Sequence, residues 1–461
     1  MSNLVKIALV LLAVSCIFAV KPHYGGEISV RLNEPTDFSY TPSSYSNMVF
    51  YSLIYENLFY LTQDGDIETY LFKEYPYDSA ARTLTLRLKD HICFSNGQPI
   101  TANHIKLSIN LFLDLNLGAS RKLRQAIKGI QARDHQVFIE LIYDDPGIVT
   151  ALTTPELVLT SGSDKVFSGI FYPEEWVEHQ YMILKPNPFY PGGRSYLDSL
   201  RVVFYDYYYP DVFLSSPGIG SDKFSELNAG VYQNIYLAFP EGKVGGNTRV
   251  ALYSLLKDFY KSQKTGDLVE LNSLTSDEES PVTLNIKKFS RSQVRSILRY
   301  SRINLYILSS LSYIEESLKE FLKKERLAIE TIFVSDNQLV NFMTNTSVKY
   351  LLMTKTFNRR TSLADKIKVI FKEMSFVRFD ETHLKLINQL DEAGNLKNSE
   401  LLMDLVSKII EKIISEGYLL PLYQKRYSLY IKNQVEGIEL DYYAKPLFQE
   451  VRVKEEEWKA R

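Results

Sequence analysis

The residues of this chain that are able to do chemistry do not form the spacings that catalysis usually needs. The six histidines include no pair four residues apart with an intervening glutamate, the pattern of a helical zinc site. No serine lies in a Gly-x-Ser-x-Gly turn, and no glycine-rich run leads into Lys-Ser or Lys-Thr. Carboxylate pairs such as Asp144-Asp145 and Glu174-Glu175 are typical of solvated turns. A site assembled from scattered residues needs no motif, but the sequence favours a binding protein without a cofactor or metal over an enzyme.

Charge and aromatic content narrow the class of partner. Lys plus Arg is 53 and Asp plus Glu is 55, so the net charge is −2. This balance argues against a protein that binds nucleic acid or anionic lipid. The 32 Tyr and 25 Phe are many, and aromatic side chains often line ligand sites, although most of them pack in a core. A chain of 461 residues is long enough for two or three domains.

The N-terminus has the pattern of an export signal. Lys6 precedes a run from Ile7 to Val20 that is apolar apart from Ser15. Fourteen residues span about 21 Å as a helix, which is short for a bilayer and typical of a signal peptide over residues 1–20. The sequence Ala-Val-Ser-Cys ending at Cys16 resembles a lipobox, in which the cysteine carries lipid. The alternatives are ordinary cleavage nearby or an uncleaved anchor, and the expected location is periplasmic or extracellular.

The elements that position a site are predicted from hydrophobic periodicity. In the first half we expect a turn and then a strand within 24–35, a helix at 49–61, a helix with Thr101 as its N-cap, and strands at 83–88, 137–143, 199–205 and 234–239. From about residue 247 strands alternate with helices, which predicts an α/β layer with a largely parallel sheet. Here the helices are expected at 249–260, 314–322, 337–343 and 402–413, and the strands at 283–286, 303–308, 328–334 and 348–353. Two extended segments follow, at 419–424 and 427–431.

The segment from Leu84 to Ser108 has the most specific pattern of the chain. A strand with an Arg-Leu pair precedes Phe-Ser-Asn-Gly-Gln-Pro-Ile-Thr-Ala, and a helix follows. This combination resembles the extracellular solute-binding proteins of oligopeptide, dipeptide and nickel ABC transporters (solute-binding protein family 5). Other segments resemble the family in the same order along residues 24–440: Gly25 to Pro35, Ile54 to Leu58, Asn187 to Asp198, Leu420 to Tyr423, and Val435 to Gly437.

The resemblance implies a two-lobed periplasmic-binding-protein-like α/β fold (type II, in the cluster with an extra subdomain), with two crossing strands between the lobes. Lobe one is placed at 24–238 plus 424–461 and lobe two at 245–423. The chain is shorter than many members, so we expect a trimmed subdomain in lobe one. Residues 167–176 lack the family's Gly-Thr-Gly-Pro-Tyr stretch. Residues 353–365 lack the Asp-Pro loop that often meets a peptide's amino group.

The resemblance also implies a function: capture of oligopeptides or dipeptides and their presentation to an ABC permease with a separate ATPase. Membrane attachment would come through the lipid anchor. From their expected positions at the cleft, the candidate ligand-binding residues are Asn33, Glu34, Tyr40, Tyr45, Phe357, Asn358, Arg359 and Tyr423. Each has a structural alternative: a turn or cap for Asn33 and Glu34, surface placement for the loop residues, and packing for Tyr423.

Two other functions remain open at this stage. The same fold is able to bind a non-peptide solute such as a metal chelate, a sugar or a small anion, which the altered loop at 353–365 favours. A paralogue that kept the fold without transport would act as a surface or interaction protein.

Overall fold

The computed structural model describes residues 24–35, 38, 45–114, 118–204, 210–214, 222–240, 246–263, 268–275, 286–334, 338, 348–358, 363, 366, 367, 369, 370, 385, 386, 389, 390 and 399–454. The predicted signal peptide with Cys16 lies outside these residues, as do Tyr40 and Arg359. No helix within the described part is long and apolar enough to span a membrane.

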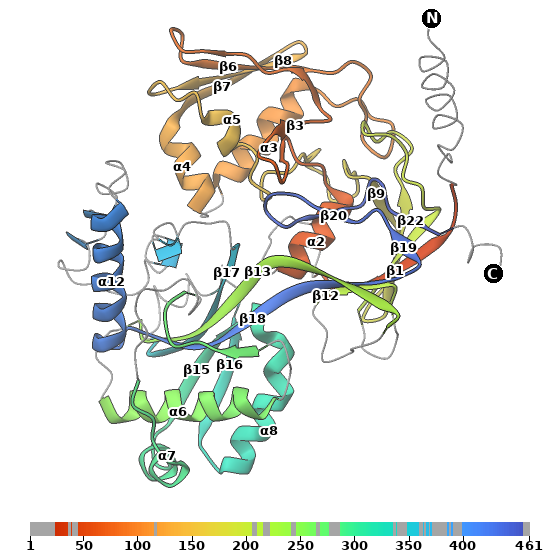
Figure 1. Ribbon diagram of the computed structural model, residues 1–461. Coiled ribbons are helices and arrows are strands. Elements are labelled where there is room, and N and C mark those ends of the chain that lie inside the picture. Colours follow the sequence, from red (N-terminus) through yellow and green to blue (C-terminus); the bar gives the residue numbers. More distant parts are fainter. Residues whose placement is uncertain are drawn as a thin grey trace, which may run out of the picture.

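The largest sheet has eleven strands and runs through both halves of the molecule (Figure 1). Its order is β16-β15-β17-β13-β18-β12-β1-β11-β10-β9, with β14 paired to β18. The first-half strands are β1 (Glu27–Arg31), β9 (Phe171–Val177), β10 (Tyr181–Pro186), β11 (Ser199–Val203) and β12 (Val212–Leu214). The second-half strands are β14 (Leu268–Glu270), β15 (Ile303–Leu308), β16 (Ile329–Val334) and β17 (Tyr350–Asn358).

Two long antiparallel strands connect these groups. Strand β13 (Phe224–Ala238) pairs with β18 (Leu419–Lys432) along almost its whole length. At one end of this pair β12 is hydrogen-bonded to β18. At the other end β14 is hydrogen-bonded to β18, and β17 to β13. The two extended segments expected at 419–424 and 427–431 are therefore one strand, and the strand expected at 234–239 begins ten residues earlier. This is the predicted α/β architecture, with two halves joined by two crossing strands.

A separate five-stranded sheet lies at the top of Figure 1. Its order is β4-β6-β8-β7, with β5 paired to β6. The strands are β4 (Phe72–Glu74), β5 (Tyr77–Asp78), β6 (Thr83–Leu88), β7 (Ile127–Arg133) and β8 (Gln136–Leu141). Alternation along β6 buries Leu84, Leu86 and Leu88 on one face, as predicted. The helices of this part are α3 (Ala102–Asp114), α4 (Gly118–Ala126) and α5 (Ile148–Ala151).

The turn before α3 has the geometry that its sequence requires. Gly97 has φ +82°, a conformation that glycine adopts without strain. Its N–H donates to the carbonyl of Phe94 (2.9 Å), and the Asn96 side chain accepts from the N–H of Gln98 (3.0 Å). Thr101 directly precedes the helix, and its N–H donates to Nδ1 of His104 (3.1 Å).

The helix predicted at 49–61 is shorter at its C-terminal end than its apolar residues suggest. Helix α2 spans Tyr45–Ile54. Beyond it the backbone bonds to another segment: the carbonyl of Ile54 accepts from Gly169 (2.9 Å), and the N–H of Glu56 donates to Ser168 Oγ (3.0 Å). Tertiary hydrogen bonds thus replace the helical ones.

The second half has the predicted alternation of strands and helices. Strand β15 pairs in parallel with β16 and β17, whereas β13 joins β17 antiparallel, so the parallel part is confined to three strands. The other elements here are α6 (Gly246–Ser262), α7 (Arg291–Leu298), η1 (Ser309–Ile314), α8 (Glu315–Glu325) and α12 (Ser399–Glu416). The strand and helix expected at 283–286 and 337–343 lie almost wholly outside the described residues.

The described residues also contain short two-stranded pairs. They are β2 (Tyr60–Leu61) with β3 (Ile67–Glu68), β19 (Val435–Glu436) with β22 (Arg452–Val453), and β20 (Glu439–Leu440) with β21 (Pro446–Leu447).

Among the residues that the structure describes, buried apolar side chains form three clusters. One lies within residues 58–159, beneath the five-stranded sheet. A second combines residues 28–231 with residues 427–451. The third contains only residues between Tyr232 and Tyr423. The second and third clusters therefore divide within the crossing strands, between Val231 and Tyr232 on β13 and between Tyr423 and Tyr427 on β18.

Candidate functional site

Polar residues occupy the crossing strands at the point where one apolar cluster gives way to the next. Gln233, Asn234 and Gln424 are buried there, at 0–3% exposure. Lys425 is half-buried and Arg426 is exposed. Buried polar side chains are costly unless they are hydrogen-bonded, so this segment is the first place to look for a function beyond packing.

One face of the segment is a closed hydrogen-bond network. Asn234 Nδ2 donates to Tyr236 Oη (3.0 Å) and to the carbonyl of Leu274 (3.3 Å). Gln424 Nε2 donates to Asn234 Oδ1 (3.0 Å), and Arg426 Nε donates to Gln424 Oε1 (3.3 Å). The network leads from the core to an exposed guanidinium and fixes the strands in register.

The opposite face of the crossing strands, which we call the lysine-bearing face, carries Lys425 and Tyr427, with Tyr313 beside them. Cross-strand pairing puts Lys425 beside Gln233. Lys425 Nζ lies 4.6 Å from the ring centroid of Tyr313 and 5.5 Å from that of Tyr427, within cation–π range. Tyr427 Oη donates to Gln233 Oε1 (3.2 Å), and the Tyr427 ring lies 5.1 Å from that of Tyr45. This face thus joins η1 of the second half to α2 of the first.

Two buried polar atoms near this face have no hydrogen-bond partner among the described residues: Gln233 Nε2 and Tyr260 Oη. The Tyr260 ring lies 5.5 Å from that of Tyr423, at an interplanar angle of 33°, and Tyr423 lies two positions from Lys425 on β18. Burial, and then the nearby Tyr313 phenol, raise the pKa of Tyr260 well above its usual value. The Tyr260 hydroxyl therefore keeps its proton and is available as a donor.

Lys257 of α6 fixes the neighbouring part of β18. Its buried ammonium donates to the carbonyls of Leu271 (3.0 Å) and Leu422 (2.6 Å) and lies 3.2 Å from Glu270 Oε1. Lys288 Nζ lies 2.5 Å from the same oxygen. Burial alone would raise the pKa of Glu270, but the two lysines outweigh it and lower this pKa. Glu270 is thus an ionised, already paired carboxylate.

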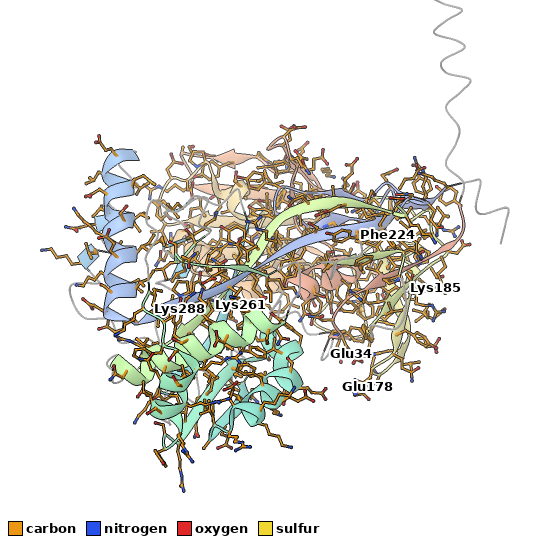
Figure 2. All side chains as sticks on the ribbon, turned by 60° about the horizontal axis from the view of Figure 1, so that its bottom comes forward. Glu34, Glu178, Lys185, Phe224, Lys261 and Lys288 are labelled. Atoms are coloured by element: carbon orange, nitrogen blue, oxygen red, sulfur yellow. The ribbon has the colours of Figure 1, made fainter. Side chains whose placement is uncertain are left out.

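The first-lobe candidates Asn33 and Glu34 lie beyond the C-terminal end of β1. The N–H of Asn33 donates to Ser46 Oγ (2.8 Å) at the start of α2. Glu34 accepts from Trp176 Nε1 (3.0 Å) and from the N–H of His179 (2.8 Å), and its other oxygen lies 2.7 Å from His179 Nδ1. Burial would raise the pKa of Glu34, but these bonds lower it. Figure 2 shows Glu34 near Glu178, well apart from Lys261 and Lys288.

The remaining candidates lie near the crossing strands or on them. Tyr45 is buried and donates to the carbonyl of Ala444 (2.5 Å). Phe357 is buried on β17 with its ring 5.9 Å from that of Tyr232, and Asn358 pairs through its backbone with Val231. Tyr423 is buried 5.1 Å from Lys257 Nζ. The structure thus brings Tyr45 and Tyr423 to the lysine-bearing face and leaves Asn33 and Glu34 elsewhere. All of them stay predictions as ligand residues.

Sequence reasoning overlooked Gln233, Tyr260, Tyr313 and Lys425. A signal was present: Gln233-Asn234 and the run Gln-Lys-Arg at 424–426 interrupt largely apolar stretches of β13 and β18. No pattern in the sequence predicts that Tyr260 and Tyr313 lie beside β18, because their positions depend on how α6 and η1 pack against the crossing strands.

A second buried polar cluster lies in the first half. Tyr60 Oη donates to the Glu56 carboxyl and lies 3.4 Å from Tyr190 Oη. Lys445 Nζ donates to Asn57 Oδ1 (2.6 Å) and lies 4.3 Å from the Tyr60 ring centroid. Burial raises the pKa of Glu56 to about 7, although Lys445 and the hydrogen bonds oppose it. Burial also lowers the pKa of Lys445, so both shifts favour the uncharged forms.

No group of three or more His, Cys, Asp or Glu within the described ranges is placed to hold a metal ion.

Comparison with known proteins identifies related sequences. Residues 67–211 match the sequence profile of the bacterial extracellular solute-binding proteins, family 5 (middle part). The chain is 25% identical over 161 residues to the probable D,D-dipeptide-binding periplasmic protein DdpA of Escherichia coli K12, covering 30% of this chain and 31% of that protein. It is 27% identical over 158 residues to the nickel-binding protein NikA of Staphylococcus aureus, covering 32% and 31%. These matches span less than a third of the length of either curated relative.

Solved structures resemble the whole fold. The oligopeptide-binding protein AppA from Bacillus subtilis, in complex with a nonapeptide, has a TM-score of 0.68 at 16% identity, covering 94% of this chain and all of that one. NikA from Staphylococcus aureus, in complex with Ni(L-His)2, has a TM-score of 0.64 at 17% identity, covering 93% and 100%. At such identities the likeness establishes the two-lobed fold.

Proposed function

Because this chain belongs to the bacterial extracellular solute-binding proteins of family 5, we propose that it captures oligopeptides or dipeptides outside the cytoplasmic membrane and presents them to the permease of an ABC importer. A separate ATPase would supply the energy of transport. Export by the signal at 1–20 and lipid attachment at Cys16 are part of the same proposal.

The crossing strands are the observation that carries the proposal. Apolar cores lie on both sides of them, and between the cores the strands present polar and aromatic side chains instead of continuing one core. A solute held there would contact both halves at once, which is how closure around a ligand is coupled to binding. An extended peptide also binds through main-chain hydrogen bonds, which tolerate varied side chains.

We propose lobe one at 24–238 plus 424–461 and lobe two at 245–423. The apolar cores divide seven residues before 238 on β13, between Val231 and Tyr232, and between Tyr423 and Tyr427 on β18. Tyr45, with Tyr40 as a further candidate, would then contact the solute from lobe one, and Tyr423 with the residues at 357–359 from lobe two. Asn33 and Glu34 lie away from the crossing strands, and the Glu34 carboxylate is bonded to Trp176 and His179.

The second candidate is a non-peptide solute such as a nickel chelate. It is favoured by the relationship to NikA and by the loop at 353–365 without Asp-Pro.

Thermal unfolding of purified residues 24–461 tests the assignment. A ligand that binds only the folded protein stabilises it, by about 2.7 kcal/mol at a hundred times its Kd. We expect mixtures of random di- to pentapeptides to raise the melting temperature, and nickel–histidine and sugars to leave it unchanged. A rise with nickel–histidine alone would transfer the assignment to the second candidate, and no rise with any solute would contradict solute capture.

A further inference from the structure

Basic residues are concentrated in one short segment of the second half. The stretch from Ile286 to Arg302 contains six basic residues and no acidic one. Arg291 and Arg295 lie four residues apart on α7, and Arg299 follows at the same spacing, so their side chains emerge from one face of the helix. Like charges at this spacing destabilise a helix, so helix stability does not explain the stripe.

The C-terminal end of α8 lies beside this stripe. Arg295 Nε lies 2.9 Å from Glu325 Oε2, which joins the two helices. The N–H of Ile303 donates to the carbonyl of Ala328 (3.4 Å), so the turn after α7 is next to the turn after α8. We call the exposed basic residues at this end of the second half the basic tip: Arg295, Arg299, Arg302, Lys323, Lys324 and Arg326.

Acidic side chains neutralise only part of the basic tip. Glu325 pairs with Arg295, and Glu320 Oε2 lies 3.9 Å from Lys324 Nζ. A surface that keeps uncompensated charge of one sign attracts a partner of the opposite sign. The residues of the tip without an ion-pair partner in the described part of the chain are Arg299, Arg302, Lys323 and Arg326.

Arg326 occupies a backbone position that favours glycine. It ends α8 with φ +56° and ψ +43°, in the left-handed region. Glycine adopts this conformation without strain and is common at helix ends, whereas a residue with a Cβ is strained there. The fold alone would be served better by glycine, so the positive charge is what arginine adds at this position.

Tyr300 places an aromatic ring among these cations. Its side chain is 86% exposed, and the Arg299 guanidinium carbon lies 5.7 Å from the ring centroid. Tyrosine is enriched where a membrane meets water, because its ring lies among the headgroups while its hydroxyl stays hydrated. Clusters of about four to eight Lys and Arg side chains bind anionic lipid headgroups. The tip combines both features.

The position of the tip favours a membrane over the importer as its partner. A partner that distinguishes the closed protein from the open one has to contact both halves, because closure changes how they lie relative to each other. Figure 1 shows α7 and α8 at the end of the second half that lies away from the crossing strands and the first half. A lipid surface needs only this one face.

We propose that the basic tip binds anionic phospholipid headgroups at a membrane surface, with the Tyr300 ring in the interfacial layer. The net charge of −2 argued against such a partner, but it averages over a chain whose positive charges are gathered at this end. The proposal goes beyond solute capture and does not depend on which solute the protein binds.

Sedimentation with lipid vesicles tests the proposal on purified residues 24–461, which lack Cys16, so that the predicted lipid anchor does not contribute. One set of vesicles contains about one-third phosphatidylglycerol in phosphatidylcholine, and the other contains phosphatidylcholine alone. We expect the wild type to bind only the anionic vesicles at about 0.1 M NaCl. About 0.5 M NaCl should release it, because salt shortens the Debye length from about 10 Å to about 4 Å.

Neutralising the tip should remove most of this binding. Each basic residue near an anionic surface contributes about fivefold to the partition coefficient, so Arg299→Gln, Arg302→Gln and Arg326→Gln together should lower it about a hundredfold. Arg326→Gly alone should lower it about fivefold without lowering the melting temperature, because glycine relieves the strained conformation.

A matched control removes the same charge from exposed positions of the first half. The triple variant Arg124→Gln, Arg133→Gln and Lys165→Gln should bind the anionic vesicles as the wild type does. An equal loss of binding in this control would show that net charge matters and the tip does not, and would overturn the proposal. So would a tip variant that binds as well as the wild type.

The remaining outcomes separate lipid from other partners and from solute capture. Wild-type protein that binds neither kind of vesicle would overturn the proposal, and binding to immobilised polyglutamate in that case would assign the tip to an acidic protein. Peptides should raise the melting temperature of the wild type and of the tip variant equally. Failure of peptide capture therefore leaves the lipid proposal standing, and failure of lipid binding leaves peptide capture intact.

Discussion

Replacing Glu56 by glutamine should change how the stability of the protein depends on pH. Glu56 is 2% exposed, and its carboxyl accepts from Tyr60. Its pKa is raised from 4.5 to about 7, mainly because burial penalises the charged form. Glutamine keeps the shape and the acceptor but does not titrate.

The sign follows from proton binding. Between pH 4.5 and 7 the folded protein keeps the Glu56 proton, whereas the unfolded chain releases it. The folded state therefore binds more protons, and its contribution to stability falls as pH rises through this window. A pKa difference of about 2.5 corresponds to about 3 kcal/mol of unfolding free energy, at about 1.4 kcal/mol per pKa unit. The contribution is fully present below pH 4.5 and lost above about pH 7.

Urea unfolding at several pH values between 4.5 and 8, followed by far-UV circular dichroism, measures the effect. Groups other than Glu56 titrate in both proteins, so the difference between wild type and Glu56→Gln isolates its contribution. The stability of the variant relative to wild type should rise by about 3 kcal/mol from pH 4.5 to 7.5. Glu178→Gln, at a side chain that is 79% exposed, is the control and should show no such trend.

The opposite trend would refute the reasoning. If Glu56 and Lys445 formed an ion pair in the folded protein, the pKa of Glu56 would lie below 4.5 and the variant would lose relative stability as pH rises. A difference independent of pH would show that Glu56 is not buried as described.

Two further substitutions test the packing around the site. Lys257→Met should cost about 3 kcal/mol of unfolding free energy, because it removes the donor for two buried carbonyls and a partner of Glu270. The control Lys261→Met, at an exposed position of the same helix, should change the melting temperature little. Equal effects of the two substitutions would contradict the role of Lys257. Gly169→Ala would place a Cβ 2.4 Å from the backbone carbon of Ile54, so we expect overpacking to cost about 1–3 kcal/mol in urea unfolding. At Gly129 a Cβ meets nothing within 4 Å, so Gly129→Ala is the control and should change the unfolding free energy little. A Gly169→Ala variant with wild-type stability would argue against the close approach of Gly169 to Ile54.

Local elements were predictable where one periodicity dominates. The alternation at 83–88 and the stripe of Ile105, Ile109 and Phe112 are buried as expected, since each pattern fits one face of one element. The end of α2 was not predictable, because hydrogen bonds of this segment with Ser168 and Gly169 compete with the helix. Such bonds join segments more than a hundred residues apart and leave no local pattern.

The site was less predictable than the fold. Position along β1 suggested that Glu34 faces a ligand, yet its carboxylate accepts from Trp176 and His179, which lie 142 and 145 residues away in sequence. The polar pair Gln233-Asn234 is visible in the sequence, but polarity within a strand predicts neither the face on which a side chain lies nor its partner. Only the pairing of β13 with β18 places Gln233 beside Lys425.

The irregularities of the β13–β18 ladder have a mechanical consequence. Register shifts fall between Asn228 and Val231 and again between Ile235 and Tyr236, so the unbroken pairs from Val231–Tyr427 to Ile235–Tyr423 form a short stretch between two weak points. Bulges bend a strand more easily than regular pairs do. When the two halves move relative to each other, the strands should bend mainly at the two ends of this stretch. The stretch itself, which includes Gln233 and Lys425, should then move as a rigid unit. Recognition geometry would then stay constant while the angle between the halves changes.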